Sequence, residues 1–303
     1  MTELTTDSRV DRPTETHKTS RHDLKNDASR GTVARHPSSG DVAWAVALGA
    51  LVLLAALPFV FMAVTSVQET MRMTATLNTA DFTLDNYVRL FLENKFAQAL
   101  LTSVIVVVIA CVLNIVVCSM AAFAFEKNPF PGSEAVFWIY IATMMVPGQV
   151  TLIPLYGITG DLGLLNTHLA LALPVVNAFG VFLIRQFMKG IPNDLLDAAR
   201  IDGATDFRIF LRIVIPLVRP VIVALAVFTF LSTWNDFLWP LVSITDAGME
   251  TVTLAAANLQ GRFTTDYGLV MAGATVTFLV PLTLYVLLQR QFVEGIVSSG
   301  VKG

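Results

Sequence analysis

Long apolar runs without charged residues alternate with short polar segments along most of this chain. Five runs contain no Asp, Glu, Lys or Arg and are each longer than twenty residues: 42–67, 96–125, 135–160, 162–184 and 267–289. A sixth run, 220–245, contains one acid, Asp236. A helix needs about 20 apolar residues to cross a bilayer, and it pairs its own backbone polar groups. The pattern therefore predicts an all-α membrane protein with six transmembrane helices.

The residues before the first run, 1–41, are polar and show no helical apolar periodicity. We expect a disordered cytoplasmic tail rather than a cleaved signal peptide, because the run that follows is too long and no small-residue cleavage site ends it. Residues 42–303 would then form one transmembrane domain. Of the 20 Lys and Arg residues, sixteen fall on the side of the two termini and four on the other side. Because cytoplasmic loops carry the excess of basic residues, both termini are predicted to be cytoplasmic.

The composition agrees with burial in lipid. Hydrophobic residues make up 54% of the chain and charged residues 14%, whereas a soluble domain carries about 25% charge. The net charge of −3 gives no indication of a nucleic-acid partner. Cys111 and Cys118 lie in the same run, separated by about 10 Å of helical rise, which is too far for a disulfide. We expect two packed thiols and no metal site.

The longest polar segment between two runs, 191–220, predicts two short helices joined by a turn. Pro192 would end the preceding span, and Asn193 would cap the next helix, with Asp194 in its first turn. Gly203 lies where the chain must turn, and a positive φ there would suit glycine. The prolines near the end of the segment would bend the entry into the fifth span.

An apolar stripe follows the turn, because Phe207, Phe210, Leu211 and Val214 recur at helical spacing. An interfacial amphipathic helix would explain this stripe. It would not explain the run that begins with Asp197, Ala198 and Ala199 and continues to Gly203. That run resembles the EAA loop of binding-protein-dependent ABC importers, whose signature is Glu-Ala-Ala, three residues and Gly. Asp197 stands here in place of the glutamate, with a shorter reach for any ion pair to a partner.

The resemblance extends over nearly all of residues 42–303, including the stretches 144–156, 163–167, 234–240 and 291–295. The most similar type is the second permease subunit of maltose- and trehalose-type importers. The resemblance implies the type I ABC importer permease fold, in the cell membrane, with segment 191–220 as a coupling loop that docks on an ATPase. The coupling residues would be Asp197, Ala198, Ala199, Asp202, Gly203, Ala204 and Phe207.

The same resemblance implies three kinds of protein partner in the bilayer and beside it. They are a second, homologous permease subunit, a dimer of ABC ATPases and an extracytoplasmic sugar-binding protein. ATP and Mg²⁺ would be bound by the ATPase subunits, and this chain would bind no cofactor and have no catalytic residues. The sequence agrees, because the glycine-rich loop ending in Lys-Ser/Thr that binds phosphates is absent from it.

Polar residues inside apolar runs are candidates for the solute pathway, since such groups usually face a cavity or another helix. The candidates are Gln149, Asn177, Trp234, Asn235 and Asp236. Asn114 and His168 are further candidates. An interhelical hydrogen bond would also explain Asn177 and His168. Helix packing would also explain Asn235 and Asp236, which lie beside Trp234 and Trp239. In the outer loop before the last run, Gly261, Thr264 and Asp266 could face the binding protein.

A secondary transporter of small polar solutes is the main alternative function. Such folds usually contain buried charges and inverted repeats. This chain has one acid within a span and no repeat that we detect.

Overall fold

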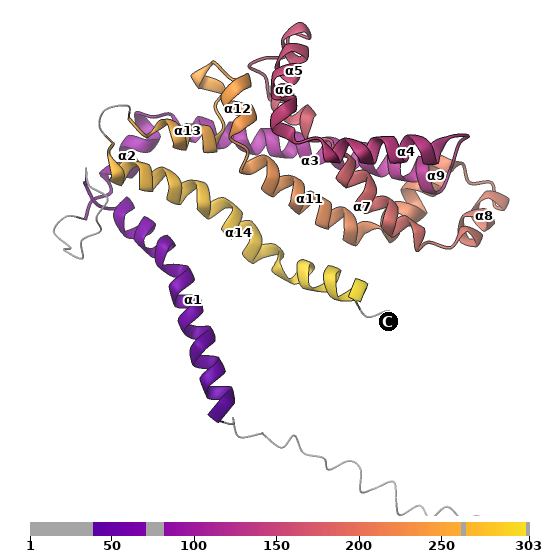
Figure 1. Cartoon of the computed structure of the whole chain (residues 1–303), viewed down its shortest axis with the longest axis horizontal. Helices are drawn as coiled ribbons and strands as arrows, with labels where there is room; N and C mark the ends of the chain where they lie inside the picture. The colour runs from indigo at the N-terminus through magenta and orange to yellow at the C-terminus, as the bar shows by residue number, and fades with distance from the viewer. Residues whose placement is uncertain (1–38, 71–81, 262–264, 301–303) are drawn as a thin grey trace, which may run out of the picture. The chain divides into compact units, whose positions relative to one another are not determined.

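The computed structural model describes residues 39–70, 82–261 and 265–300, and most of them are helical (Figure 1). Within these ranges the one extended pairing is an isolated bridge between Gln68 and Phe82. In chain order the elements are α1 (Ser39–Ser66), α2 (Asp85–Leu92), α3 (Phe96–Glu126), α4 (Ser133–Ala142), η3 (Thr143–Met145), α5 (Gly148–Asp161), α6 (His168–Ala172), η4 (Leu173–Val175), α7 (Ala178–Lys189), α8 (Asn193–Ile201), α9 (Asp206–Ile209), η5 (Phe210–Val214), α10 (Ile215–Leu217), α11 (Arg219–Trp234), α12 (Leu238–Ser243), η6 (Ala247–Met249), α13 (Val252–Asn258) and α14 (Tyr267–Gly300).

Two compact units divide the chain, residues 1–56 and residues 57–303. In the first unit the described residues belong to α1, and large apolar side chains such as Trp44 and Leu53 are 72% exposed. Exposed apolar surface of this extent suits contact with lipid. The predicted tail, 1–41, lies outside the described residues except for 39–41, which already belong to α1. The second unit contains the end of α1 and all later elements.

Three of the predicted spans are continuous helices. The segments Ala43–Ser66, Phe96–Glu126 and Tyr267–Leu287 are each long and apolar enough to cross a membrane without a break. They coincide closely with the predicted runs 42–67, 96–125 and 267–289, which confirms those predictions. The last helix continues beyond its run, because α14 extends to Gly300.

The other three predicted spans are not single straight helices, and the sequence prediction is wrong on this point. The runs 135–160 and 162–184 each form a pair of helices bent at a short break. The third bent pair breaks just before the run 220–245, where the prolines were predicted to bend the entry into the fifth span, so that prediction is confirmed. The described residues contain up to six crossings if each pair counts as one. The bends are 106° between Ser133–Met145 and Gly148–Asp161, 47° between His168–Val175 and Ala178–Lys189, and 78° between Asp206–Leu217 and Arg219–Trp234.

Local chemistry explains where these helices break. Val146 is extended (φ −83°, ψ 118°), as expected for a residue before proline, and Pro147 has no N–H to continue the helix. At the second break Asn177 is extended, and its Oδ1 accepts the Gly180 N–H at 3.0 Å, which caps α7. The run 220–245 is divided as well, because α11 ends at Trp234 and α12 is a separate helix.

The long helix α3 is the centre of the second unit. It packs against α6, α7, α11 and α13 (Figure 1). Buried Asn114 on α3 donates to Thr229 Oγ1 on α11 at 2.8 Å and accepts the Cys118 thiol at 3.0 Å. Asn114 was a candidate for the solute pathway, and in the structure it makes an interhelical hydrogen bond. Both cysteines are free thiols, as predicted.

Candidate functional site: a polar cavity and an exposed loop

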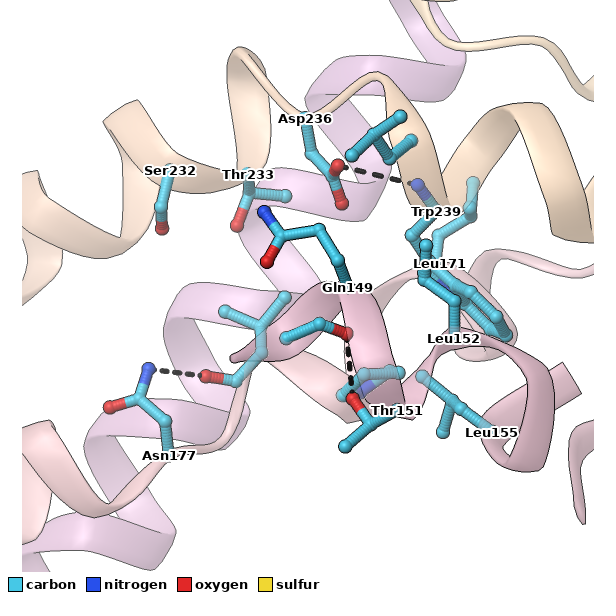
Figure 2. A pocket seen from close by; sticks show the side chains of 14 residues that line it. Gln149, Thr151, Leu152, Leu155, Leu171, Asn177, Ser232, Thr233, Asp236 and Trp239 are labelled. Carbon is cyan, nitrogen blue, oxygen red and sulfur yellow. Dashed lines mark hydrogen bonds between the residues drawn. The ribbon is translucent and has the colours of Figure 1, made fainter. Parts of the chain in front are cut away.

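A cavity of about 420 Å³ opens where several helices begin or end (Figure 2). Its walls come from α5, α6 and η4, from Asn177 at the start of α7, from the last turn of α11, and from the beginning of α12. The helix breaks described above therefore border it. The lining residues are Gly148, Gln149, Thr151, Leu152, Leu155, Leu171, Pro174, Val175, Asn177, Ser232, Thr233, Asp236, Leu238 and Trp239.

The polar part of this lining is uncharged except for one acid. It contains one carboxylate, two amides and three hydroxyls, which belong to Asp236, Gln149, Asn177, Thr151, Ser232 and Thr233. None of the fourteen lining residues is basic. Such groups can exchange hydrogen bonds with a polyhydroxylated solute, while leucine and tryptophan side chains contact its carbon-bound faces.

The polar lining side chains differ in the number of hydrogen bonds that they already make within the protein. Asn177 is occupied on both sides, because Nδ2 donates to Val175 O at 2.9 Å and Oδ1 accepts from Gly180 N at 3.0 Å. Asp236 Oδ1 accepts a long bond, 3.4 Å, from the Trp239 N–H. Gln149 makes no hydrogen bond within the described residues, and Figure 2 shows its amide reaching toward Thr233 and Asp236. Gln149 is therefore the lining amide that is free for a solute.

The structure brings together three of the five predicted pathway residues, Gln149, Asn177 and Asp236. The other two do not line the cavity. Trp234 is 2% exposed and donates from Nε1 to Thr277 O on α14 at 3.1 Å, so its ring packs in the core. Asn235 is exposed, and its Nδ2 donates to Leu231 O at 2.8 Å.

Sequence reasoning missed several lining residues. Thr151, Ser232 and Thr233 gave no signal, because hydroxyl groups in apolar helices commonly bond to their own backbone. Thr151 Oγ1 does so, donating to Gly148 O at 2.8 Å. Trp239 was noticed only as an aromatic neighbour of Asp236. Its indole N–H donates to Ala170 O at 2.8 Å and fixes α12 against α6.

The segment 191–220 contains the predicted helix, turn and second helix. Helix α8 ends beside Asp202, and Gly203 has φ +81°, so the turn is left-handed as expected. Arg200 closes the turn, because its guanidinium pairs with Asp197 at 2.8 Å and with Asp206 at 3.2 Å. The predicted cap is wrong, since Pro192 occupies the N-cap position and Asn193 is the first helical residue.

The predicted coupling residues separate into two faces. Asp197, Ala198, Asp202, Gly203 and Phe207 are exposed, with Phe207 66% exposed. By contrast, the remaining two, Ala199 and Ala204, pack toward a core cluster that contains Leu196. Ile201 is 86% exposed and was not predicted, although an apolar residue between two charged ones on a short polar helix is a usable signal.

The predicted apolar stripe after the turn is not a single face. Phe210 and Val214 are buried, whereas Phe207 and Leu211 are exposed. The five residues Phe210–Val214 form a π-helical turn, which is wider than an α-helical turn and changes the angular spacing of side chains. The regular α-helical periodicity assumed from the sequence therefore does not hold here.

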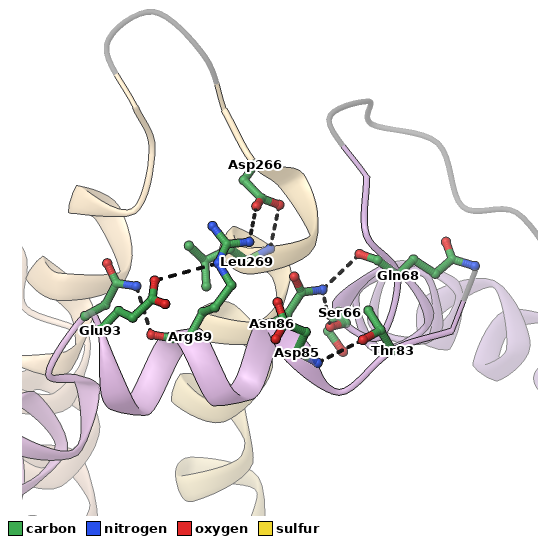
Figure 3. A network of polar contacts seen from close by, with 10 residues as sticks. Ser66, Gln68, Thr83, Asp85, Asn86, Arg89, Glu93, Asp266 and Leu269 are labelled. Carbon is green, nitrogen blue, oxygen red and sulfur yellow. Dashed lines mark hydrogen bonds and ion pairs between the residues drawn. The ribbon is translucent and has the colours of Figure 1, made fainter. Parts of the chain in front are cut away.

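Away from the cavity and the α8 loop, a network of polar contacts joins α2 to the start of α14 (Figure 3). Asp266 Oδ2 pairs with Arg89 Nη1 at 2.8 Å, and Asp266 Oδ1 accepts from Leu269 N at 3.2 Å. Asn86 on α2 donates to Ser66 O at 3.0 Å and Gln68 O at 2.9 Å. Asp266 was considered a contact for a binding protein, but its carboxylate is engaged within the fold. Gly261 is exposed, and Thr264 lies outside the described residues.

Comparisons with known proteins agree with this architecture. Residues 115–297 match the family described as binding-protein-dependent transport system inner membrane component. The lactose transport system permease protein LacG of Rhizobium radiobacter is 34% identical, over 81% of this chain and 91% of its own length. The arabinooligosaccharides permease AraQ of Bacillus subtilis is 32% identical, over 72% and 79%. The sn-glycerol-3-phosphate permease UgpE of Shigella flexneri is 36% identical, over 67% and 74%.

Solved structures show the same fold. A chain of a bacterial ABC transporter involved in the import of the acidic polysaccharide alginate superposes with a TM-score of 0.73 at 20% identity, covering 84% of this chain and 98% of that one. A second structure, an alginate ABC transporter in complex with a pentasaccharide-bound periplasmic protein, matches with a TM-score of 0.57 at 15% identity, covering 81% of this chain and 92% of that one. The six-helix permease fold predicted from the sequence is thereby confirmed.

The family also decides between the two functions left open by the sequence, because its members are subunits of binding-protein-dependent systems rather than solitary secondary transporters. The exposed apolar helices and the fold match identify a multi-pass membrane protein. This chain therefore belongs to the family of inner membrane components of binding-protein-dependent transport systems, and it is a permease subunit of an ABC importer, not an enzyme.

Proposed function

We propose that this chain forms half of the solute pathway in an ATP-driven importer of neutral sugars or oligosaccharides, and that the cavity lies on that pathway. The observation that carries the proposal is the lining itself, which has amide, hydroxyl and carboxylate groups and no basic residue. Several relatives of this chain are named as permeases for lactose, arabinooligosaccharides and alpha-glucosides.

Charge favours a neutral solute over an anionic one. A phosphate or uronate group in the cavity would lie near the Asp236 carboxylate and would meet no basic side chain among the described lining residues. Like charges in a site partly shielded from water repel, and an unpaired buried charge is costly. A polyhydroxylated neutral solute has no such penalty, and its hydroxyls can donate to Asp236 and accept from Gln149.

We further propose that the exposed face of α8 docks on an ABC ATPase. Helix α8 and its C-cap present Ile201 beside the acids Asp197 and Asp202, and the exposed Phe207 follows on α9, just after the turn. ATP and Mg²⁺ would be held by the ATPase dimer, which would drive this subunit together with a homologous permease. An extracytoplasmic binding protein would deliver the solute.

The proposed orientation places both termini and the α8 loop in the cytoplasm of a cell-membrane protein. The support is the distribution of the Lys and Arg residues. Single cysteines at positions 38 and 299, on a background without Cys111 and Cys118, should stay unlabelled by an impermeant reagent in intact cells. They should react after the membrane is opened. Labelling from outside at either position would contradict this topology.

Reconstitution tests the function directly. The chain, co-expressed with a homologous permease subunit and an ABC ATPase from the same organism, should purify as a complex whose ATP hydrolysis is stimulated by a solute-loaded binding protein. Neutral disaccharides should stimulate it, whereas glycerol 3-phosphate and alginate oligosaccharides should not. A complex without ATPase subunits would contradict the docking proposal, and stimulation by the anionic solutes alone would contradict the proposed substrate class.

A further inference from the structure

Lys127 directly follows α3 and is a buried cation with neutral partners. The residue is 8% exposed. Its Nζ donates to Ile191 O at 2.7 Å and to Asn193 Oδ1 at 3.0 Å. Both acceptors belong to the chain that leads into α8, so the lysine joins the end of α3 to the beginning of the exposed loop helix.

The acids around Lys127 do not neutralise it by direct contact. Glu126 is adjacent in sequence, but its carboxylate pairs with Arg185 at 2.9 Å. Arg185 also binds Glu134 and lies 3.9 Å from the centre of the Phe137 ring. Burial accordingly lowers the pKa of Lys127. Burying a charge without an ion-pair partner costs free energy, so an apolar residue would stabilise this position better if packing were the only role of Lys127.

The other end of α8 also contacts this residue. Arg200, in the last turn of α8, donates from Nη2 to Lys127 O at 3.5 Å, a longer and weaker contact than those of Nζ. Arg200 is itself held by Asp197 and Asp206. The side chain of Lys127 thus binds the start of α8, and its carbonyl contacts the end of α8.

From α3 the connection continues to the cavity. Asn114 on α3 bonds to Thr229 on α11 at 2.8 Å. Three residues later, Ser232 begins the part of α11 that lines the cavity. A displacement of α8 therefore has a continuous route of hydrogen bonds and packed helices to the cavity wall.

We propose that Lys127 is a positioning residue that transmits movement of α8 to α3, and through α3 to α11 and the cavity. The proposal rests on the docking function proposed above for α8. Its basis is that Lys127 contacts both ends of α8. Lys127 also directly follows α3, the helix that packs against α6, α7, α11 and α13. Lys127 contacts neither the solute nor the ATPase in this arrangement.

The test is the number of solute molecules imported per ATP hydrolysed, measured on the whole complex in proteoliposomes with loaded binding protein. Lys127→Met keeps the apolar stem and removes the donors. Because two charge-assisted hydrogen bonds are lost, the ratio should fall at least about fivefold, while the amount of bound ATPase stays unchanged. Lys127→Arg should retain most of the ratio. Lys189→Met removes an exposed lysine at the end of α7 and should have no effect.

The outcomes separate the possible failures. If wild type shows no bound ATPase or no solute-stimulated hydrolysis, the proposed function itself fails. If wild type is coupled and Lys127→Met imports as many solute molecules per ATP, only the role of Lys127 fails. A merely structural role would lower import and hydrolysis in proportion and leave the ratio intact. Should Lys127→Met not assemble, Asn193→Ala, which removes one acceptor at an exposed position, must lower the ratio about twofold; an unchanged ratio there would also contradict the proposal.

Discussion

Arg89 and Asp266 lie 177 residues apart in sequence, yet Nη1 of the arginine and Oδ2 of the aspartate are 2.8 Å apart (Figure 3). The pair joins α2 to the residue that precedes α14. The Asp266 side chain is 14% exposed and the Arg89 side chain 33%, so water screens the pair only in part. The pair is therefore positioned to hold the start of the last span.

We expect Arg89→Ala and Asp266→Ala each to lower the stability of the second unit, and the double variant to lose less than the sum. The coupling energy should be about 1 kcal/mol, the upper end for partly exposed pairs. Thermal unfolding of the detergent-solubilised complex measures it. Glu93→Ala is the control, because its contact with Arg89 is longer, 3.8 Å, and its side chain is 68% exposed. Strict additivity would show that the ion pair contributes nothing.

Asp236 and Asn235 form a matched pair for testing the cavity. Asp236 lines it, whereas its neighbour does not. Asp236→Ala should weaken solute-stimulated transport about fivefold, which corresponds to about 1 kcal/mol for one lost hydrogen bond. Asn235→Ala should leave transport near the wild-type level. The measurement is uptake of labelled solute as a function of its concentration. A larger loss of transport in Asn235→Ala than in Asp236→Ala would contradict the proposal that the cavity lies on the solute pathway.

Gly203 should be required for its backbone conformation rather than for lack of space. Its φ is +81°, and a Cβ would meet nothing within 4 Å. Gly203→Val should therefore cost about 1–2 kcal/mol in the turn, shift α8, and reduce the amount of ATPase that co-purifies. Gly163 has φ +65° and equally open surroundings, so Gly163→Val imposes similar strain outside the loop. It should retain the ATPase; equal loss in both variants would contradict specific docking.

Gly268 and Gly273 on α14 test close packing. A Cβ on Gly268 would overlap the Gln68 carbonyl oxygen, which is backbone and cannot easily move. A Cβ on Gly273 would meet a terminal methyl carbon of Leu259, which can change rotamer. Gly268→Ala should destabilise by about 2 kcal/mol, and Gly273→Ala by less than about 1 kcal/mol. Melting temperatures of the two variants decide this; similar values would show that the Gln68 segment can yield.

The continuous spans were predictable because composition alone determines them. A run of thirty residues with no charge, such as the one that forms α3, has no other favourable structure in a bilayer. The breaks had local signals as well, in Pro147 and Asn177. Those signals were missed because the spans were predicted from the number of apolar residues alone. That number does not show where a backbone hydrogen bond of the helix is lost.

The cavity was only half predictable, for a different reason. Polar side chains in apolar runs stand out, which identified Gln149 and Asp236. The choice between Trp234 and Trp239 depends on the acceptor of each indole N–H, which is Thr277 O on α14 for Trp234 and Ala170 O in α6 for Trp239. Those partners are 43 and 69 residues away, and no local pattern specifies them. The contacts of Lys127 could not be predicted for the same reason, because one acceptor is a backbone carbonyl 64 residues further along the chain.

The broken helices place backbone hydrogen-bonding groups near the cavity. A helix interior satisfies its own peptide groups, but the first N–H groups and the last C=O groups of a helix have no partner within it. The cavity is bordered by the first turn of α5, whose backbone N–H groups lie beside the lining side chains. It is also bordered by the last turn of α11, where the carbonyls of Leu231 and Trp234 already accept hydrogen bonds from Asn235 and Thr253. Side-chain replacement leaves this contribution in place. The lining side chains would then set which solute is carried, and the helix ends would add hydrogen bonds that substitutions at those side chains do not remove.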